Sequence, residues 1–129
     1  MTEKYLLEQA QKAKEFAYTP YFHFRVGAAL LTESGKVYTG CNVENAAGSS
    51  ICAERTALVK AVSEGECSFK AIAIVSDGDD FIYPCGVCRQ ALVEFSPDMK
   101  VVTENAKNEI KIFTLDELLP NFFGPKSLK

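Results

Sequence analysis

Segments typical of strands and of helices alternate through the middle of the chain, and this alternation restricts the fold more than any other feature. Strand-like segments lie at residues 36–41, 71–75 and 99–103, and helix-like segments lie between them at residues 52–64 and 85–95. When a helix connects two neighbouring strands of one sheet, the crossover is right-handed and the strands run parallel. The pattern predicts an α/β fold in which successive strands of this series are parallel neighbours.

Two further strand-like segments flank this series. Residues 24–31 are apolar on both faces after Gly27, which is typical of a central strand. A short turn at residues 33–35 joins this segment to residues 36–41, and the pair predicts an antiparallel hairpin. The last strand-like segment covers residues 109–113.

Amphipathic patterns predict one more helix near each end of the chain. The first has apolar residues at spacings of four, three and four and should end before Pro20: Leu6, Ala10, Ala13 and Ala17. The last should begin at Thr114, which forms a capping box with Glu117, and should stop at Pro120.

Length and composition fit a single globular domain over residues 1–129. The chain has 47% hydrophobic and 24% charged residues, which argues against disorder. Its net charge of −3 disfavours a nucleic-acid partner, because phosphate binding needs clustered Lys and Arg. No apolar run reaches the roughly 18 residues of a membrane span, and the N-terminus lacks a signal-peptide pattern. We therefore expect a cytoplasmic protein without membrane contact.

The cysteines indicate a metal site rather than disulfides. There are five, and an odd number without a secretion signal fits a disulfide framework poorly. The chain has one histidine, His23, so a zinc site would consist mostly of thiolates. We expect His23 to have a structural or interface role.

Three of the cysteines, Cys52, Cys85 and Cys88, lie where helices follow strands. Ligands collect beyond the carboxyl ends of parallel strands, so the two segments can converge on one point. Helix N-termini stabilise thiolates and lower their pKa. Three protein ligands with one open position are typical of a catalytic zinc, which lowers the pKa of a bound water.

Charged residues beside these cysteines have predicted roles as well. Glu54 follows Cys52 by two residues and could move the proton of a bound water without coordinating the metal. Three thiolates and Zn²⁺ sum to a charge of −1, which a nearby cation should offset. Arg55 and Arg89 are the candidates, and we predict that Arg55 hydrogen-bonds a ligand sulfur.

The chain resembles the small homotetrameric cytidine deaminases from about Tyr18 to Pro125. The paired cysteine motif is itself a signature of zinc deaminases. The resemblance is carried by five segments: Phe24–Ala29, Gly40–Ala46, Cys52–Ala57, Pro84–Gln90 and Leu118–Pro120.

This resemblance implies one zinc per chain and a set of site residues. The metal would be held by Cys52, Cys85 and Cys88, with Glu54 as proton shuttle. The substrate would be bound by a ribose pair and three further residues: Asn42 and Glu44 at the 3′-hydroxyl, Ala46 in the same segment, Phe24 against the base, and Phe123 reaching a neighbouring subunit's site. The stretch from Asn42 to Cys52 is one residue shorter than is usual in the family, which predicts a shortened sugar-binding loop.

Other interpretations of these residues stay open at this point. The three cysteines could be buried small side chains or a structural zinc site with Cys41 as fourth ligand, and Cys85 and Cys88 could form a redox pair. Glu54 could be an ordinary acid at a helix N-terminus. The remaining candidates could fill turns, core or tail: Asn42, Glu44, Phe24 and Phe123.

We expect a three-layer α/β/α sandwich with a mixed five-stranded sheet. The expected function is hydrolytic deamination of cytidine and 2′-deoxycytidine in pyrimidine salvage. The acidic balance favours a free nucleoside over cytosine in RNA or DNA. Two alternatives are a deaminase of a blasticidin-type nucleoside antibiotic, which Glu44 and Asn45 disfavour, and a non-catalytic, zinc-stabilised binding module.

Overall fold

The computed structural model describes residues 2–129. Its elements, in chain order, are α1 (Glu3–Lys14), β1 (Val26–Thr32), β2 (Val37–Cys41), α2 (Ala53–Ser63), β3 (Phe69–Ser76), α3 (Gly86–Val93), β4 (Lys100–Glu104), β5 (Ile110–Thr114), α4 (Leu115–Leu118) and a final 3₁₀ turn, η1 (Pro125–Leu128). None of the helices in this described part of the chain is long and apolar enough to cross a bilayer.

The sheet has five strands in the order β2-β1-β3-β4-β5, and it is mixed as predicted. Only β3 and β4 are parallel, whereas the other three neighbouring pairs are antiparallel. The prediction that β2 and β3 are neighbours is wrong, because β1 lies between them and pairs with both. The two strands still run in the same direction, so the α2 crossover passes over β1. The predicted central position of β1 is confirmed.

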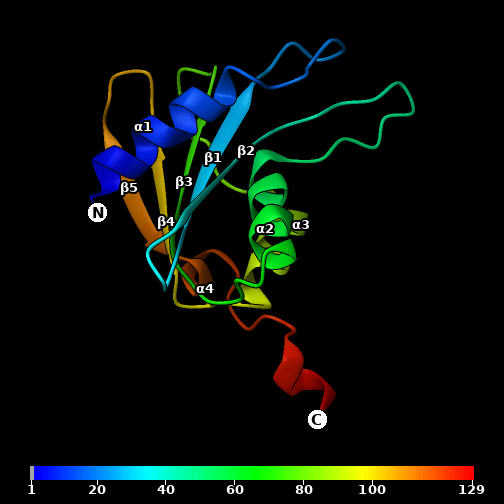
Figure 1. The fold of residues 1–129 in the computed structure, drawn as a ribbon, viewed down its shortest axis with the longest axis vertical. Helices are drawn as coiled ribbons and strands as arrows, with labels where there is room; N and C mark the ends of the chain where they lie inside the picture. Colours follow the sequence, from blue (N-terminus) through cyan, green and yellow to red (C-terminus); the bar gives the residue numbers. More distant parts are fainter. Residues whose placement is uncertain (1) are drawn as a thin grey trace.

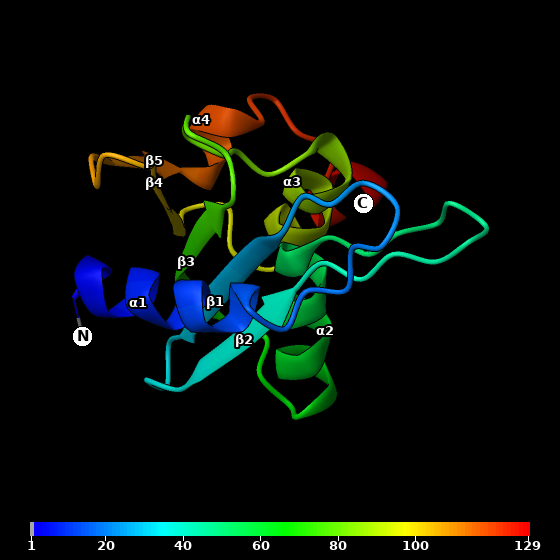
Figure 2. The ribbon, with the colours of Figure 1, turned by 90° about the horizontal axis from the view of Figure 1, so that it is seen from above.

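Helices cover both faces of the sheet, which confirms the predicted three-layer sandwich (Figures 1 and 2). On one face α1 buries Leu6, Leu7 and Ala10 against side chains of β1, β3 and β4. On the other face α2 and α3 enclose the larger core cluster, which includes Phe69 and Leu92.

Two glycines allow the helices to approach the sheet closely. A Cβ atom at Gly27 of β1 would collide with the Ala10 carbonyl of α1, and one at Gly40 of β2 would collide with the backbone of α2 at Ala53 and Ala57. The close approach on both faces therefore depends on the absence of these side chains.

Helix ends differ from the predicted ones by one to three residues. The first helix ends at Lys14 instead of reaching Ala17, because the N–H of Glu15 closes onto carbonyls of the last turn. The next residues leave the helix, and Tyr18 forms a bridge with Val43 instead. The capping box of Thr114 and Glu117 is confirmed.

Two long connections project from the same end of the sheet. Residues 15–25 and 42–52 run side by side there, away from the C-terminal tail (Figures 1 and 2). Val43 joins them by pairing with Tyr18 and with Ile51. Most predicted substrate residues lie on these two connections.

Candidate metal centre and substrate cavity

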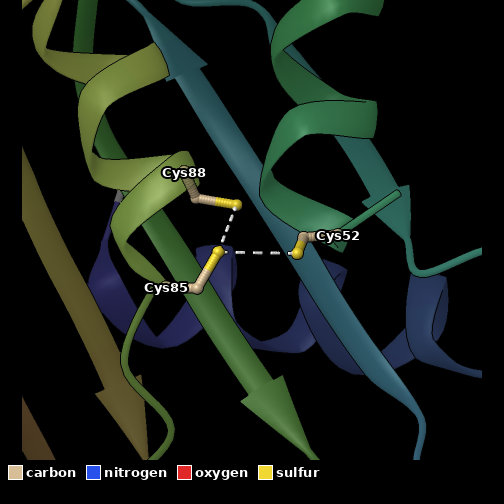
Figure 3. Close-up of side chains that lie close together, drawn as sticks. All are labelled: Cys52, Cys85 and Cys88. Carbon is tan, nitrogen blue, oxygen red and sulfur yellow. Dashed lines mark hydrogen bonds between the residues drawn. The ribbon is translucent and has the colours of Figure 1, made fainter. Parts of the chain in front are cut away.

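The side chains of Cys52, Cys85 and Cys88 converge on one point, as Figure 3 shows. The Sγ atoms of Cys52 and Cys85 are 3.7 Å apart, and those of Cys85 and Cys88 are 3.5 Å apart. Among the described residues this is the one cluster of three or more metal-binding side chains. Cys41 lies outside the cluster, so the alternative of a structural zinc with Cys41 as fourth ligand is wrong.

Two helix N-termini position these sulfurs. Cys52 and Cys85 are the N-cap residues of α2 and α3, each with an extended backbone, and Cys88 lies in the first turn of α3. Neither N-cap uses its side chain as a capping group, so both sulfurs are free to face the shared point. The positive ends of both helices stabilise thiolates there.

The donor set fits a zinc ion. Two sulfurs that each lie about 2.3 Å from a tetrahedral ion are about 3.8 Å apart, close to the separations seen here. Burial decreases in the order Cys88, Cys52, Cys85, since Cys88 is buried and Cys85 is exposed. The cluster can therefore hold one ion from the protein side and leave its outer side accessible.

The charges around the sulfurs favour a thiolate at Cys52. Its pKa falls to about 5, because the Cys88 thiol donates a hydrogen bond to its sulfur and the Arg55 guanidinium assists. The same interaction, with burial, raises the pKa of Cys88. Nη2 of Arg55 lies 3.6 Å from Sγ of Cys52, the predicted contact, while its buried Nε has no hydrogen-bond partner among the described residues. Arg89 binds the carbonyls of Pro84 and Leu118 instead.

Glu54 is buried beside the cluster, with only 4% of its surface exposed. This burial raises the pKa of its carboxyl group to about 7, and the negative charge of Cys52 acts in the same direction. An ordinary acid at a helix N-terminus is exposed and stabilised as the anion. Glu54 instead suits proton transfer near neutral pH, since it can both hold and release a proton there.

A cavity of about 160 Å³ brings the cluster and Glu54 together with the predicted substrate residue Asn42. Its wall also contains Cys52, Cys85 and Ser50. Ser50 is shared with an adjoining cavity of about 220 Å³, which Glu44 and Ala46 line. The candidate site therefore has two parts that share Ser50, one at the cysteines and one at the 42–52 connection.

The two predicted ribose-binding residues, Asn42 and Glu44, form hydrogen bonds with backbone groups of residues 21–26. Nδ2 of Asn42 donates to the Phe24 carbonyl at 2.9 Å, and its Oδ1 accepts from the Val26 N–H at 2.9 Å. Oε1 of Glu44, a residue only 6% exposed, accepts from the N–H groups of Tyr21 and Phe22. Each side chain thus ties the 42–51 connection to the 15–25 connection.

The two predicted aromatic residues lie in different regions. Phe24 is 39% exposed, lies two residues before β1, and lines neither part of the site. Phe123 is 60% exposed on the C-terminal tail and lines neither part of the site within its own chain. His23 stands in a left-handed conformation (φ 56°) in the loop before Phe24.

Six residues of the cavity wall were not among the predicted site residues: Val26, Ser50, Ile51, Ala53, Ile82 and Tyr83. Ile82 and Tyr83 immediately precede the Pro84-Cys85 motif, and this position was the available signal. The edge-to-face contact of Tyr83 with Phe113 joins residues far apart in the chain, which no sequence pattern indicates.

Three thiols at two helix N-termini, next to a buried carboxyl group in a small cavity, are typical of zinc-dependent enzymes that act on water. Comparison with known proteins agrees. Residues 1–104 match the family described as cytidine and deoxycytidylate deaminase zinc-binding region. The chain belongs to this family, which confirms the resemblance and the zinc prediction.

Relatives and solved structures agree along nearly the whole chain. It is 50% identical to a cytidine deaminase from Sporosarcina psychrophila (95% of this chain, 92% of that one) and 50% identical to a probable cytidine deaminase from Dictyostelium discoideum (95% and 84%). A crystal structure of cytidine deaminase from Burkholderia pseudomallei superposes with a TM-score of 0.92 at 46% identity, covering 95% of this chain and all of that one.

Proposed function

We propose that this protein deaminates free cytidine and 2′-deoxycytidine by hydrolysis, giving uridine or 2′-deoxyuridine and ammonia, as a step of pyrimidine salvage. The observation that carries the proposal is the convergence of three sulfurs and the buried Glu54 on one small cavity. The proposal covers residues 1–129 as one domain.

Cys52, Cys85 and Cys88 would hold the zinc ion. When bound, zinc would supply the electrophilic centre that ionises water near neutral pH, as in other zinc deaminases. Arg55 would offset the negative charge of the three thiolates through its contact with Cys52. The pKa of Cys52, lowered to about 5, favours the thiolate that binds metal.

Glu54 would move the protons of the reaction. Its carboxylate accepts a proton from water and delivers it to N3 of the cytosine ring, so that C4 accepts the water oxygen. The remaining proton then passes to the amino group, which leaves as ammonia when the C4–N bond breaks. The sum is cytidine and water to uridine and ammonia. A carboxyl group whose pKa lies near 7 suits both proton transfers.

The cavity would bind a small nucleoside. Its volume of about 160 Å³ suits a single ring, and the adjoining part offers Glu44 and Ala46 to a sugar. Asn42 and Glu44 would bind the ribose 3′-hydroxyl and Phe24 would pack on the base. None of the residues that line either part is Lys or Arg, which supports a neutral nucleoside over a polynucleotide.

We also propose that the chain acts as a cytoplasmic homotetramer to which Phe123 contributes across a subunit boundary. Support comes from two exposed apolar residues, Val59 on α2 and Val87 on α3, and from a groove that Val87 lines together with Leu58 and Phe95. Large exposed apolar areas are typical of interfaces. Sedimentation should give a tetramer, and a stable, fully active monomer would contradict this assembly.

The decisive experiment follows the ultraviolet absorbance of cytidine with purified protein, before and after removal of metal by a chelator. We expect loss of cytidine absorbance, abolition by the chelator and recovery on adding zinc. Binding of one zinc per chain without turnover would support the binding module instead. Parallel assays with blasticidin S test the antibiotic alternative, which requires faster turnover of that compound than of cytidine.

A further inference from the structure

Two side chains, one just after each strand that neighbours β1, bind the backbone of three consecutive residues, Phe24 to Val26, where β1 begins. Asn42, just after β2, binds the Phe24 carbonyl and the Val26 N–H. From the other side Asp77, just after β3, accepts from the Arg25 N–H at 3.0 Å, and its own N–H donates to the Arg25 carbonyl at 3.0 Å. The backbone on both sides of the Phe24 carbonyl is therefore fixed from two directions.

Asp77 also accepts hydrogen bonds from the side chain of Arg25. Nε of Arg25 donates to Oδ2 at 2.9 Å and Nη2 donates to Oδ1 at 3.1 Å, so the pair is bidentate. Nζ of Lys14 from α1 lies 3.1 Å from the same Oδ1, and Glu15 takes the other Nη of Arg25. Bidentate pairs of this kind fix orientation as well as distance.

Gly78, the residue after Asp77, packs against the aromatic ring of Phe24. A Cβ atom at Gly78 would lie 3.3 and 3.4 Å from Cε1 and Cζ of Phe24, so the ring rests on bare backbone. The N–H of Gly78 donates to Oγ of Ser76 at 3.1 Å, which fixes this backbone in turn. Asp77 and Gly78 thus hold, respectively, the chain next to Phe24 and the ring of Phe24.

We infer that Asp77 is a positioning residue for substrate binding: together with Gly78 it fixes the ring of Phe24, which lies two residues before the cavity-lining Val26. The inference rests on the proposed function, in which Phe24 packs on the base. Asp77 itself belongs neither to the cysteine cluster nor to the residues that line the cavity. Its effect on the reaction therefore passes through Phe24.

Asp77 receives more hydrogen-bond donors than a role in stability alone requires. Part-exposed ion pairs contribute little to the free energy of unfolding, yet this carboxylate receives a backbone N–H, two guanidinium N–H groups and an ammonium group. All of these donors come from Arg25, which adjoins Phe24, or from α1. The contacts define the place of one short segment.

The test is a double-mutant cycle of Asp77→Ala with Phe24→Ala, measured as kcat and KM for cytidine. Asp77→Ala alone should raise KM about 3- to 10-fold, the equivalent of one or two modest hydrogen bonds, with kcat nearly unchanged. In the Phe24→Ala background the same substitution should leave KM unchanged. Gly78→Ala, whose new methyl group pushes on the ring, should behave in the same way.

Two outcomes would overturn the inference. One is an equal rise of KM with and without Phe24, which would show that Asp77 does not act through the ring. The other is a lower melting temperature with unchanged KM, which would show a purely structural role. Asp77→Asn is the milder substitution if Asp77→Ala does not fold, and Glu66→Gln, which removes the charge opposite Lys36 at 3.6 Å, is the matched control with unchanged KM.

A spectroscopic measurement tests the positioning separately from turnover. The chain has no tryptophan, so Phe24→Trp introduces a single tryptophan, whose emission can be excited apart from that of the five tyrosines. Adding Asp77→Asn to this variant should increase acrylamide quenching and lower the fluorescence anisotropy, whereas Glu66→Gln should change neither. Identical fluorescence with and without Asp77 would overturn the inference even if the wild type did not act on cytidine.

Discussion

The metal centre and the substrate rim of this site are built in different ways. The centre places its cysteines and Glu54 at the N-cap positions and in the first turns of two packed helices, and Glu54 is almost fully buried. The rim places Asn42, Glu44 and Ala46 on a connection that projects from the sheet (Figure 2). Helices fix the centre, whereas hydrogen bonds between two loops fix the rim. Substitutions in the centre should therefore change metal content or kcat, and those in the rim should change KM and stability.

The largest effect is expected for a metal ligand. Cys85→Ser should lower zinc content well below one per chain and reduce kcat more than ~10³-fold, because the activated water, whose pKa zinc lowers from about 15.7 to about 7, is lost. Metal analysis and the cytidine assay measure both quantities. Cys67→Ser, at an exposed cysteine outside the cluster, is the control. Full zinc content and activity in Cys85→Ser would contradict the proposal that Cys85 is a zinc ligand.

Removing the proton-transfer group separates chemistry from metal binding. Glu54→Gln should keep one zinc per chain and nearly the wild-type KM, while kcat falls roughly 10²- to 10⁴-fold. Glu64→Gln, at the exposed C-terminal end of the same helix, should be neutral. A fully active Glu54→Gln enzyme would disprove the proposed proton path.

The rim should give the opposite kinetic signature. Glu44→Ala removes the acceptor of the Tyr21 and Phe22 N–H groups, so KM should rise about 10- to 100-fold and stability should fall by about 1–3 kcal/mol. Glu44→Gln keeps an acceptor oxygen and should recover most of the stability. Thermal unfolding and steady-state kinetics measure the two effects. A fall in kcat at unchanged KM would contradict the expectation that the rim determines substrate binding and the centre determines the chemical step.

A smaller effect is expected where a cation supports the centre. Arg55→Ala leaves the Cys52 sulfur without its guanidinium contact, so zinc affinity should fall about 10- to 100-fold, the range for groups that support metal ligands. Competition with a chromophoric chelator measures this affinity. Arg55→Lys should recover part of the loss, and an unchanged affinity in Arg55→Ala would refute the role.

The smallest effect concerns acid stability. The Arg25 guanidinium lowers the pKa of Asp77 to about 2 from its ordinary 3.8, so the ionised pair stabilises the fold above pH 4 and the stabilisation disappears as pH falls towards 2. Asp77→Asn should be about 1 kcal/mol less stable at pH 6, because the pair is partly screened by solvent. Denaturant titrations at pH 6 and pH 2.5 should show this difference shrinking, and an equal difference at both values would contradict it.

Features that depend on neighbouring residues could be predicted from the sequence. The cysteine spacing, Glu54 in the first turn of a helix and the capping box of Thr114 and Glu117 all follow from local patterns. The central place of β1 followed from its two apolar faces. These are properties that a few adjacent side chains determine.

Features that join distant residues could not be predicted. The rule that a helix connects neighbouring parallel strands predicted β2 beside β3. Instead β1, the other strand of the hairpin, lies between them and pairs with both. Asn42 binds the backbone on both sides of Arg25 and also lines the cavity. Asp77 and Gly78 hold Phe24 and the residue after it. These contacts link positions 24, 42 and 77–78. No spacing rule connects such positions, since three strand ends bring them together.

The most direct test of the account is the coordination of zinc in the purified protein, measured by X-ray absorption at the zinc edge. The account predicts three sulfur neighbours at about 2.3 Å and one oxygen neighbour at about 2.0 Å. That oxygen signal should persist in Glu54→Gln. A shell of four sulfurs, or of two or fewer, would contradict a three-cysteine centre with one position open to water.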